Sequence, residues 1–399
     1  MTHRFTATVA RGLEEALAAE LRSLSLSDVT VGRGAVEFTG DISAGYRACL
    51  WSRVASRVLL RLATVPAADG DALYEGAMAL PWADHVGRGA TIAVVCVGAN
   101  PAIRHTHYGA LKVKDAICDV LRRDTGERPD VDRAEPDVQV HVHVHGEEAG
   151  IAVDLTGRPL HFRDRGRDGG PAPLKETLAA GILQLAGWSE VVAEGGLLVD
   201  PMAGSGTLVI EAADIARGRA PGLRRQLWGF TGWRGHDAAA WGQLVEEARD
   251  AVRPAGGLRV FASDRDADQV RRLEGNLERA GMVGEIKVRH CDLSQVHPPG
   301  KGREAVPHGL LVTNPPYGVR LGEADEVKAT WKSLGDILRR RFLGWEGWLL
   351  AGDPVLAKSL GLRPKRRHVV YNGPLEARLL QVPIRSAPVA RDVEPDAAS

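Results

Sequence analysis

Hydrophobic and polar positions follow two different periods near the start of the chain. Residues 2–9 have the pattern of a short strand, and apolar residues then recur at helical spacing between Leu13 and Leu24. A second strand pattern ends at residues 36–38. This order of strand, helix and strand predicts a small α+β unit at the N-terminus.

A second α+β unit is predicted downstream. The apolar run 92–97 indicates a strand, residues 111–121 have a helical pattern, and residues 138–145 alternate strictly before the apolar run 151–155. Strands that flank a helix in this way are typical of another small module. We find no internal repeat that would join the two units into an array.

The alternating strand carries three histidines. It places them on one face and three valines on the other, namely His141, His143 and His145 against Val140, Val142 and Val144. A metal site is one interpretation. A solvated strand face is favoured, because no carboxylate or cysteine joins the histidines at ligand spacing. We therefore expect no metal.

The pattern changes after residue 160. Residues 163–173 are rich in charge, Gly and Pro, which predicts a linker and a domain boundary near residue 160. Strands then alternate with helices, the sign of a parallel sheet covered on both faces. The expected strands are 197–199, 258–262, 286–288, 310–312 and 348–351, and the expected helices are 174–186, 206–217, 265–280, 327–342 and 354–360.

The last elements form a different arrangement. Residues 369–371 and 379–384 flank Asn372-Gly373 and predict an antiparallel hairpin, enlarged by Pro374. The residues after Ser386 are expected to be a disordered tail. The fold class is therefore α/β, a doubly wound domain preceded by α+β units.

Composition excludes several classes of protein. The 399 residues contain 51 Lys and Arg against 51 Asp and Glu, so bulk charge cannot bind nucleic acid and local basic patches would be needed. The cysteines form no CxxC pair, which argues against a zinc ribbon or a dense disulfide framework and fits a reducing compartment. No apolar stretch approaches ~20 residues, and the start lacks a signal-peptide core. We expect a cytoplasmic protein without membrane contact.

The first chemical motif is a buried strand that runs into a glycine turn and a helix, LLVDPMAGSGT at residues 197–207. Gly204 and Gly206 lack a Cβ, so the backbone can turn tightly and approach a ligand, and the following helix offers free N–H groups. The spacing differs from GxGxxG and lacks the P-loop lysine. A tight turn without ligand is the alternative to a cofactor loop. The candidate loop residues are Asp200, Met202, Ala203, Gly204, Ser205, Gly206 and Thr207.

Two further carboxylates follow strands of the predicted parallel sheet, Asp264 and Asp292. Ligands bind at the carboxyl ends of such strands. Asp264 could accept both hydroxyls of an adenosine ribose, and Asp292 could accept the adenine amino group. Each residue could instead be a helix cap.

The motif Asn314-Pro315-Pro316-Tyr317 follows the strand 310–312 and points to amine chemistry. The exocyclic amine of guanine is a poor nucleophile, because its lone pair is delocalised into the ring. The Asn314 amide oxygen and the Pro315 carbonyl could accept its two hydrogens and turn the lone pair toward a methyl group. Tyr317 could stack on a base. A rigid proline turn with a packed tyrosine is the alternative.

These motifs together resemble the class I methyltransferases that use S-adenosylmethionine to methylate exocyclic amines. Further segments are similar to the 23S ribosomal RNA guanine-N2 methyltransferases, at residues 172–180, 220–223, 360–366 and 372–380. In that family a THUMP domain, a small RNA-binding module, precedes the catalytic domain, and residues 111–117, 128–131 and 153–157 look like its THUMP region. The resemblance covers about residues 1–385.

The resemblance implies four parts and one reaction. It implies a ferredoxin-like segment at 1–45, a THUMP-like domain at 46–160, a Rossmann-like methyltransferase domain at 161–386 and a tail at 387–399. S-Adenosylmethionine would be bound by the loop residues together with Asp264, Asp292 and Asn314. The N2 amine of a guanosine, most readily in 23S ribosomal RNA, would attack the methyl group in line. Positioning would dominate over base catalysis, and no metal would be required.

The sequence departs from the family pattern at three places. Met202-Ala203 replaces an expected Met-Cys, a small change, and residues 161–166 differ from the basic motif usual there, which leaves the RNA contacts of that segment undefined. The chain also ends without the second methyltransferase domain that some relatives carry. We therefore expect a single methylation.

Basic clusters supply the local charge that RNA binding needs. One cluster lies at residues 217–225 and is followed by Trp228 and Trp233, and another lies at 363–367. Such clusters suit a phosphate track with stacking platforms, and a solvated helix face with core tryptophans is the alternative at the first. The expected RNA contacts are Lys112, Lys114, Arg163, Lys175, Arg224, Arg225, Lys365, Arg366 and Arg367.

Other functions share part of this pattern. A tRNA guanine-N2 methyltransferase would carry the same motifs, and a DNA amino methyltransferase would share the Asn-Pro-Pro-Tyr chemistry without the THUMP-like region. An RNA-binding ribosome-assembly factor with a vestigial cofactor pocket is the alternative from another class. The residues favour a monomeric RNA methyltransferase.

Overall fold

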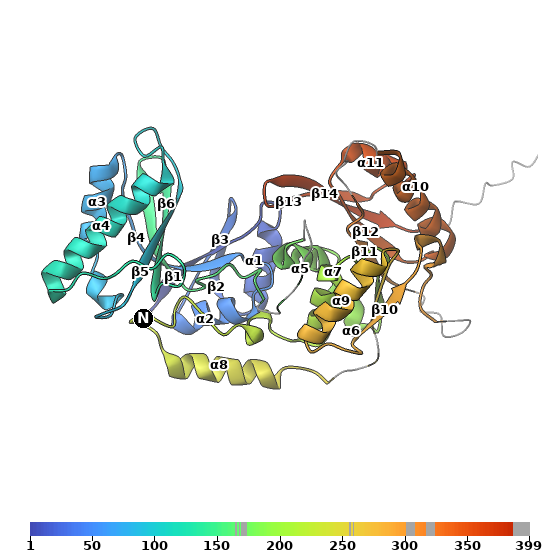
Figure 1. The fold of residues 1–399 in the computed structure, drawn as a ribbon, viewed down its shortest axis with the longest axis horizontal. Helices are drawn as coiled ribbons and strands as arrows, with labels where there is room; N and C mark the ends of the chain where they lie inside the picture. Colours follow the sequence, from blue (N-terminus) through green and yellow to red (C-terminus); the bar gives the residue numbers. More distant parts are fainter. Residues whose placement is uncertain are drawn as a thin grey trace, which may run out of the picture.

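The computed structural model describes residues 1–163, 166, 168, 174–254, 257, 259–300, 308–316 and 324–385. These residues form two seven-stranded sheets, each with its own helices. The last two strands of the second sheet, β13 (Arg366–Asn372) and β14 (Leu375–Pro383), extend toward the first sheet in the upper part of Figure 1. Most of the predicted linker, the tail after Ser386 and Tyr317 lie outside the described residues. No helix among the described residues is both long and apolar enough to cross a membrane.

The N-terminal sheet has the order β2-β3-β1-β4-β7-β6-β5. Its elements are β1 (His3–Thr8), α1 (Glu14–Ser23), β2 (Ser27–Gly32), β3 (Ala35–Gly40), α2 (Ile42–Trp51), β4 (Arg57–Pro66), α3 (Gly70–Met78), a 3-10 turn (Trp82–Asp84), β5 (Ile92–Gly98), α4 (Thr106–Thr125), β6 (Val138–His145) and β7 (Glu148–Asp154). The first βαββαβ unit and the second α+β unit thus form one continuous sheet.

Strand β4 joins the two units. It pairs antiparallel with β1 on one side and with β7 on the other. The sequence pattern did not identify β4 or α2, and the expected boundary between residues 45 and 46 falls inside α2.

The histidine strand is an interior strand, paired with β5 and β7. Its alternating valines are buried as expected, while His143 and His145 are exposed. His141 is 8% exposed, so the expectation that all three histidines share a solvated face is wrong at this position. His141 lies opposite Ala152 of β7, within the width of the sheet.

The C-terminal sheet has the order β10-β9-β8-β11-β12-β14-β13, with the first five strands parallel and the last two antiparallel. Its elements are α5 (Glu176–Leu185), α6 (Trp188–Ala193), β8 (Leu197–Asp200), α7 (Thr207–Ala216), a 3-10 turn (Pro221–Arg224), α8 (Ala238–Asp250), β9 (Val260–Asp264), α9 (Ala267–Arg279), β10 (Ile286–His290), a 3-10 turn (Leu293–Gln295), β11 (Gly309–Thr313), α10 (Ala324–Arg341), β12 (Glu346–Ala351), α11 (Pro354–Ser359), β13 (Arg366–Asn372) and β14 (Leu375–Pro383). The predicted doubly wound sheet with a final hairpin is confirmed.

Both faces of this sheet are buried, which explains the continuous apolar runs in its strands. Alternate residues point to opposite cores. Leu198 and Leu310 pack in the core that contains α5 and α7. Their neighbours Leu197, Val199 and Leu311 pack in the core that contains α10 and α11. The helices therefore hold the carboxyl ends of the parallel strands in a fixed position.

A segment of the C-terminal half returns to the N-terminal sheet. Residues 225–237 lead into α8, which contacts α2 and lies beneath it in Figure 1. Trp233 stacks on His85, with its Nε1 donating to His85 Nδ1 at 3.1 Å. Phe230 packs against Tyr46, with ring centroids 4.6 Å apart. The predicted boundary near residue 160 is therefore bridged by side chains from both halves.

Candidate active site

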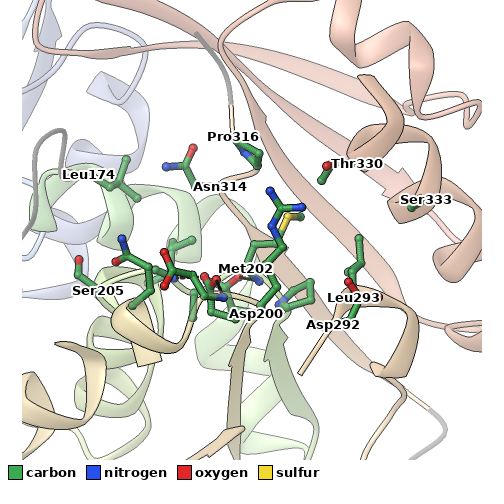
Figure 2. Close-up of a pocket in the computed structure, with 18 of the residues that line it drawn as sticks. Leu174, Asp200, Met202, Ser205, Asp292, Leu293, Asn314, Pro316, Thr330 and Ser333 are labelled. Atoms are coloured by element: carbon green, nitrogen blue, oxygen red, sulfur yellow. Dashed lines mark hydrogen bonds between the residues drawn. The ribbon is translucent and has the colours of Figure 1, made fainter. Parts of the chain in front are cut away.

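A cavity of about 630 Å³ opens at the carboxyl ends of the parallel strands. It brings together most of the predicted site residues, and Figure 2 shows Asn314 and Pro316 across from the loop that carries Met202 and Ser205. The predicted residues that line it are Asp200, Met202, Ala203, Gly204, Ser205, Thr207, Asp264, Asp292, Asn314 and Pro316. Gly206 lies in the glycine turn after β8 and Pro315 lies in the turn after β11, but neither residue lines the cavity.

The glycine turn after β8 requires both of its glycines. Gly204 and Gly206 have φ values of +53° and +90°, in the left-handed region that favours glycine. A Cβ on Gly206 would overlap Leu273 of α9, whereas a Cβ on Gly204 would meet nothing within 4 Å. Gly206 thus lets α7 pack on α9, and Gly204 keeps the backbone open to the cavity. No side chain caps α7, so its first N–H groups are left for a ligand.

Asp200 is the most buried carboxylate of the cavity, with 1% of its surface exposed. Burial raises the pKa of its carboxyl to about 7, and the charge of Asp264 acts in the same direction. The hydrogen bond from the Met202 N–H opposes this rise in pKa. The Met202 N–H donates to Asp200 Oδ1 at 3.1 Å, so Asp200 fixes the start of the glycine turn.

Asp264 supports the glycine turn from the next strand. Its Oδ2 accepts from the Gly204 N–H at 2.9 Å, and its Oδ1 accepts from the Asp266 N–H at 3.0 Å. The cap of α9 is Asp266, which accepts from the Asp268 N–H. The helix-cap alternative for Asp264 is therefore wrong for α9.

Asp292 combines both of its predicted interpretations. It caps the 3-10 turn Leu293–Gln295 by accepting from the Ser294 N–H at 2.8 Å, and it also lines the cavity. Hydrogen bonds from the side chain and backbone of Ser294 lower the pKa of its carboxyl. An exposed carboxylate at this edge remains charged in neutral solution.

The turn after β11 presents a buried acceptor. Asn314 Oδ1 is buried and has no hydrogen-bond partner among the described residues. An unpaired buried amide oxygen is costly, which marks a group that a ligand can satisfy. From α10, the fully buried Trp331 donates its Nε1–H to the Pro316 carbonyl at 3.2 Å and so fixes the turn.

Sequence reasoning missed the wall of the cavity formed by α10. Glu326, Ala329, Thr330 and Ser333 line it at the spacing of one helix face. Glu326 also forms an ion pair with Arg265 at 2.6 Å, between α10 and the turn after β9. The sequence feature that could have identified this wall is the row of small and polar residues along one face of the amphipathic helix α10.

The basic residues expected at RNA divide into two groups. The expectation is wrong for Arg163 and Arg225, because both are buried, at 3% and 7% exposure. Arg163 donates to the carbonyls of Leu160 and Arg53, and it pairs with Glu211. Arg225 donates to the carbonyls of Thr156, Arg158 and Pro159. Their guanidinium groups join the two halves of the chain.

The remaining basic residues are more accessible. Arg224 is largely engaged with Asp214 and the Ala280 carbonyl, and Lys112 and Lys114 form ion pairs with Asp71 and Asp115. Those left exposed are Lys175, Lys365, Arg366 and Arg367. Among the residues that the structure describes, no group of three or more His, Cys, Asp or Glu side chains could hold a metal ion.

Three family models match the chain. They are the RlmL ferredoxin-like domain at residues 4–59, the THUMP domain at 67–154, and the RMKL-like methyltransferase domain at 163–381. Two curated relatives are named ribosomal RNA large subunit methyltransferase K/L. The one from Syntrophotalea carbinolica is 44% identical over 96% of this chain and 53% of its own length, and the one from Allochromatium vinosum is 43% identical over 96% and 52%. The chain thus spans about half the length of these relatives.

Solved structures share the fold over nearly the whole chain. SMU.472, crystallised with SAH, is 27% identical with a TM-score of 0.85, covering 97% of this chain and 99% of its own. A predicted N6-adenine-specific DNA methylase from Listeria monocytogenes is 28% identical with a TM-score of 0.84, covering 96% of each chain. TrmN from Thermus thermophilus, at 22% identity and a TM-score of 0.66, shares the fold alone. The chain belongs to the family of RMKL-like methyltransferase domains, here preceded by ferredoxin-like and THUMP domains.

Proposed function

We propose that this chain transfers a methyl group from S-adenosylmethionine to the N2 amine of a guanosine in large-subunit ribosomal RNA. The observation that carries the proposal is the buried, unpartnered Asn314 Oδ1 beside a cavity that also contains a glycine turn. The THUMP domain and the names of the curated relatives support RNA, and ribosomal RNA in particular, as the substrate. A DNA substrate would leave the THUMP domain without a role.

The cavity fits the proposed cofactor. Its volume lies within the range of small-molecule sites, and the open space at Gly204 leaves the backbone accessible to a ligand. Asp264 would accept from the ribose hydroxyls, Asp292 from the adenine amine, and the uncapped start of α7 would face the remaining polar groups. When bound, S-adenosylmethionine supplies a methyl group made electrophilic by the neighbouring sulfonium.

The chain's own residues prepare the amine. Asn314 Oδ1 accepts one of its hydrogens, and the Pro315 carbonyl accepts the other, which turns the lone pair out of the ring plane. Pro316 has no N–H to compete for the acceptors in this turn. Because Trp331 holds the Pro316 carbonyl, the two acceptors need little reorganisation when the base arrives. The predicted stacking role of Tyr317 lies outside the described residues.

Substitution of Asn314 tests the proposal. Asn314→Ala should lower turnover by at least ~10²-fold, because a positioned hydrogen-bonding group contributes about that much. Its affinity for S-adenosylmethionine, measured by calorimetry, should stay within a few-fold. Asp264→Ala is the matched control and should weaken cofactor binding by ~1.5–3 kcal/mol. Near wild-type turnover in Asn314→Ala would remove the role assigned to this residue.

The identity of the RNA needs a separate experiment. Mass spectrometry of ribosomal and transfer RNA from a deletion strain should show loss of N2-methylguanosine in the large-subunit ribosomal RNA only. Loss from transfer RNA would support the tRNA alternative, and no loss together with intact cofactor binding would support a non-catalytic assembly factor. The monomeric state and the cytoplasmic location stay predictions.

A further inference from the structure

The last hairpin of the catalytic domain touches the first unit of the chain. Gly12, between β1 and α1, lies against the backbone of β13, and a Cβ at Gly12 would overlap the Val369 carbonyl. The adjacent Arg11 places its guanidinium 5.0 Å from the centroid of the Tyr371 ring. Residues more than 350 positions apart in sequence therefore form one surface, visible in Figure 1 where β13 approaches β3 and α1.

Basic side chains gather at this contact. Tyr371 lies on the same face of β13 as Arg367 and Val369, because they alternate along the strand. Arg378 of β14 pairs with Val369, and Arg33 lies close enough to Tyr371 for its charge to act on the hydroxyl. We call Arg11, Arg33, Arg367 and Arg378 the seam patch. Arg11, Arg33 and Arg367 are exposed, and none of the four has an ion pair among the described residues.

The carboxylates beside the patch are already engaged. Glu14 accepts from the N–H groups of Gly12 and Gly34, at 2.7 and 3.0 Å. Glu376 accepts from the Tyr371 hydroxyl at 2.9 Å. These acids hold the loops and the ring in place, and the four arginines outnumber them. The patch therefore keeps a net positive charge, with four arginines against two carboxylates.

The register of the sheet places the patch near the catalytic turn. Ala351, at the carboxyl end of β12, pairs with Arg378, which in turn pairs with Val369. Asn314 follows Thr313, the last residue of β11. Thr313 pairs with Leu349, which lies two residues before the carboxyl end of β12. The patch and the catalytic turn thus lie at the same end of the strands of this sheet. Three strand spacings separate β11 from β13, or about 14 Å.

We propose that the seam patch binds backbone phosphates of the RNA whose target base enters the cavity. The inference rests on the proposed function. Exposed arginines without acidic partners suit phosphates, which fix the register of a nucleic acid without reading its sequence. Since the first unit supplies two of the arginines and the catalytic domain the other two, the phosphate site exists only while the two are docked.

The double variant Arg11→Ala/Arg33→Ala tests the patch in the full chain. Its binding to a large-subunit ribosomal RNA transcript is measured by fluorescence anisotropy between 50 and 200 mM salt. The slope of log affinity against log salt should become shallower by about 1.4, from roughly 0.7 per phosphate contact on single strands. Affinity at 0.1 M salt should fall roughly tenfold or more, and affinity for S-adenosylmethionine should stay unchanged.

Two further variants separate charge from structure. Lys287→Ala/Arg289→Ala removes two exposed basic residues from β10, at the opposite edge of the same sheet, and should leave the salt slope as it is. Arg11→Lys/Arg33→Lys keeps the charge and should restore the slope. If the alanine variant has the wild-type slope and affinity, or if lysine fails to restore them, the patch does not bind RNA.

The outcome also distinguishes this inference from the proposed function. Methylation of RNA by the intact chain together with unchanged RNA binding by the alanine variant overturns the patch alone. A shallower salt slope in a chain that methylates no RNA overturns the proposed reaction and leaves the patch as an RNA surface.

Discussion

Two arginine-rich stretches look alike in sequence but have opposite environments. Residues 217–225 and 363–367 are both strongly basic and contain no acid. In the first stretch, Arg219 bonds Asp214 at 2.6 Å and Arg217 bonds Glu285 at 2.5 Å. In the second stretch, the basic side chains are exposed and form no ion pair among the described residues.

The difference shows that a run of basic residues in a sequence indicates positive charge but does not indicate whether acidic residues elsewhere in the chain pair with it. Asp214 precedes the first stretch on α7, and Glu285 follows it by 60 residues, so neither lies within the run itself. A buried guanidinium is stable only when it is paired or fully hydrogen-bonded. The basic side chains of the first stretch are therefore already paired within the fold, and those of the second are free for a partner.

The largest expected effect comes from Arg225. Arg225→Ala removes hydrogen bonds to three carbonyls of the Thr156–Pro159 turn and a cation–π contact with Trp228. The free energy of unfolding should fall by about 3 kcal/mol or more, since hydrogen bonds to a charged group contribute most when buried. Urea denaturation measures it. Arg366→Ala is the control and should change stability by less than ~0.5 kcal/mol. Equal effects of the two variants would erase the contrast between the stretches.

The same contrast between buried and exposed charge applies to carboxylates. The folded-state pKa of Asp200 is about 7, raised above its unfolded value by burial. The folded protein therefore binds this proton more tightly, so the contribution to stability is fully present at low pH and is lost as pH rises through the folded pKa. Between pH 5 and 7.5 the loss should be roughly 2–3 kcal/mol.

Asp200→Asn should remove that part of the pH dependence, as measured by urea denaturation across the range. Asp292→Asn is the opposite control. Because the folded-state pKa of Asp292 is lowered, its contribution is present above the unfolded pKa and is lost as pH falls through the folded value. If the Asp200→Asn profile follows the wild type between pH 5 and 7.5, Asp200 is not protonated on folding.

A smaller effect is expected from a buried neutral donor. Trp331→Phe keeps an aromatic ring but removes the hydrogen bond to the Pro316 carbonyl. A neutral hydrogen bond contributes ~0.5–1.5 kcal/mol, so turnover should fall up to about tenfold. The cofactor dissociation constant should stay within about twofold. Trp345→Phe, in the same hydrophobic cluster, controls for loss of core volume. A parallel fall in cofactor affinity would mean that Trp331 supports the domain and not the catalytic turn.

The smallest effect should come from the exposed stretch. Lys365→Ala should leave the free energy of unfolding within ~0.5 kcal/mol of wild type. Its binding to ribosomal RNA should weaken a few-fold, and the salt slope should become shallower by about 0.7. Anisotropy over a salt series measures both. An unchanged slope would place Lys365 away from the phosphates.

The sequence predicted those parts of the fold whose signal is local. Strands β8 and β11 are short apolar runs followed by motifs, and the glycine turn and Asn314 could be assigned from residue types alone. Helix α8 could not, because it buries only Leu244 and Ala248 and its position depends on contact with the distant α2. The structural roles of Arg163 and Arg225 were missed for the same reason, since Arg163 donates to the distant Arg53 carbonyl and Arg225 donates to the distant Pro159 carbonyl.

Strand β4 has a consequence for synthesis of the protein. Since β4 pairs with β1 and with β7, the N-terminal sheet is complete only when residue 154 has left the ribosome. The ring of Tyr46 then still lacks its cover, which Phe230 and Trp241 provide. The nascent N-terminal half therefore exposes an apolar surface until about 90 further residues are translated, a period of several seconds at the usual rate. Exposed apolar surface of this kind favours aggregation until its cover has been made.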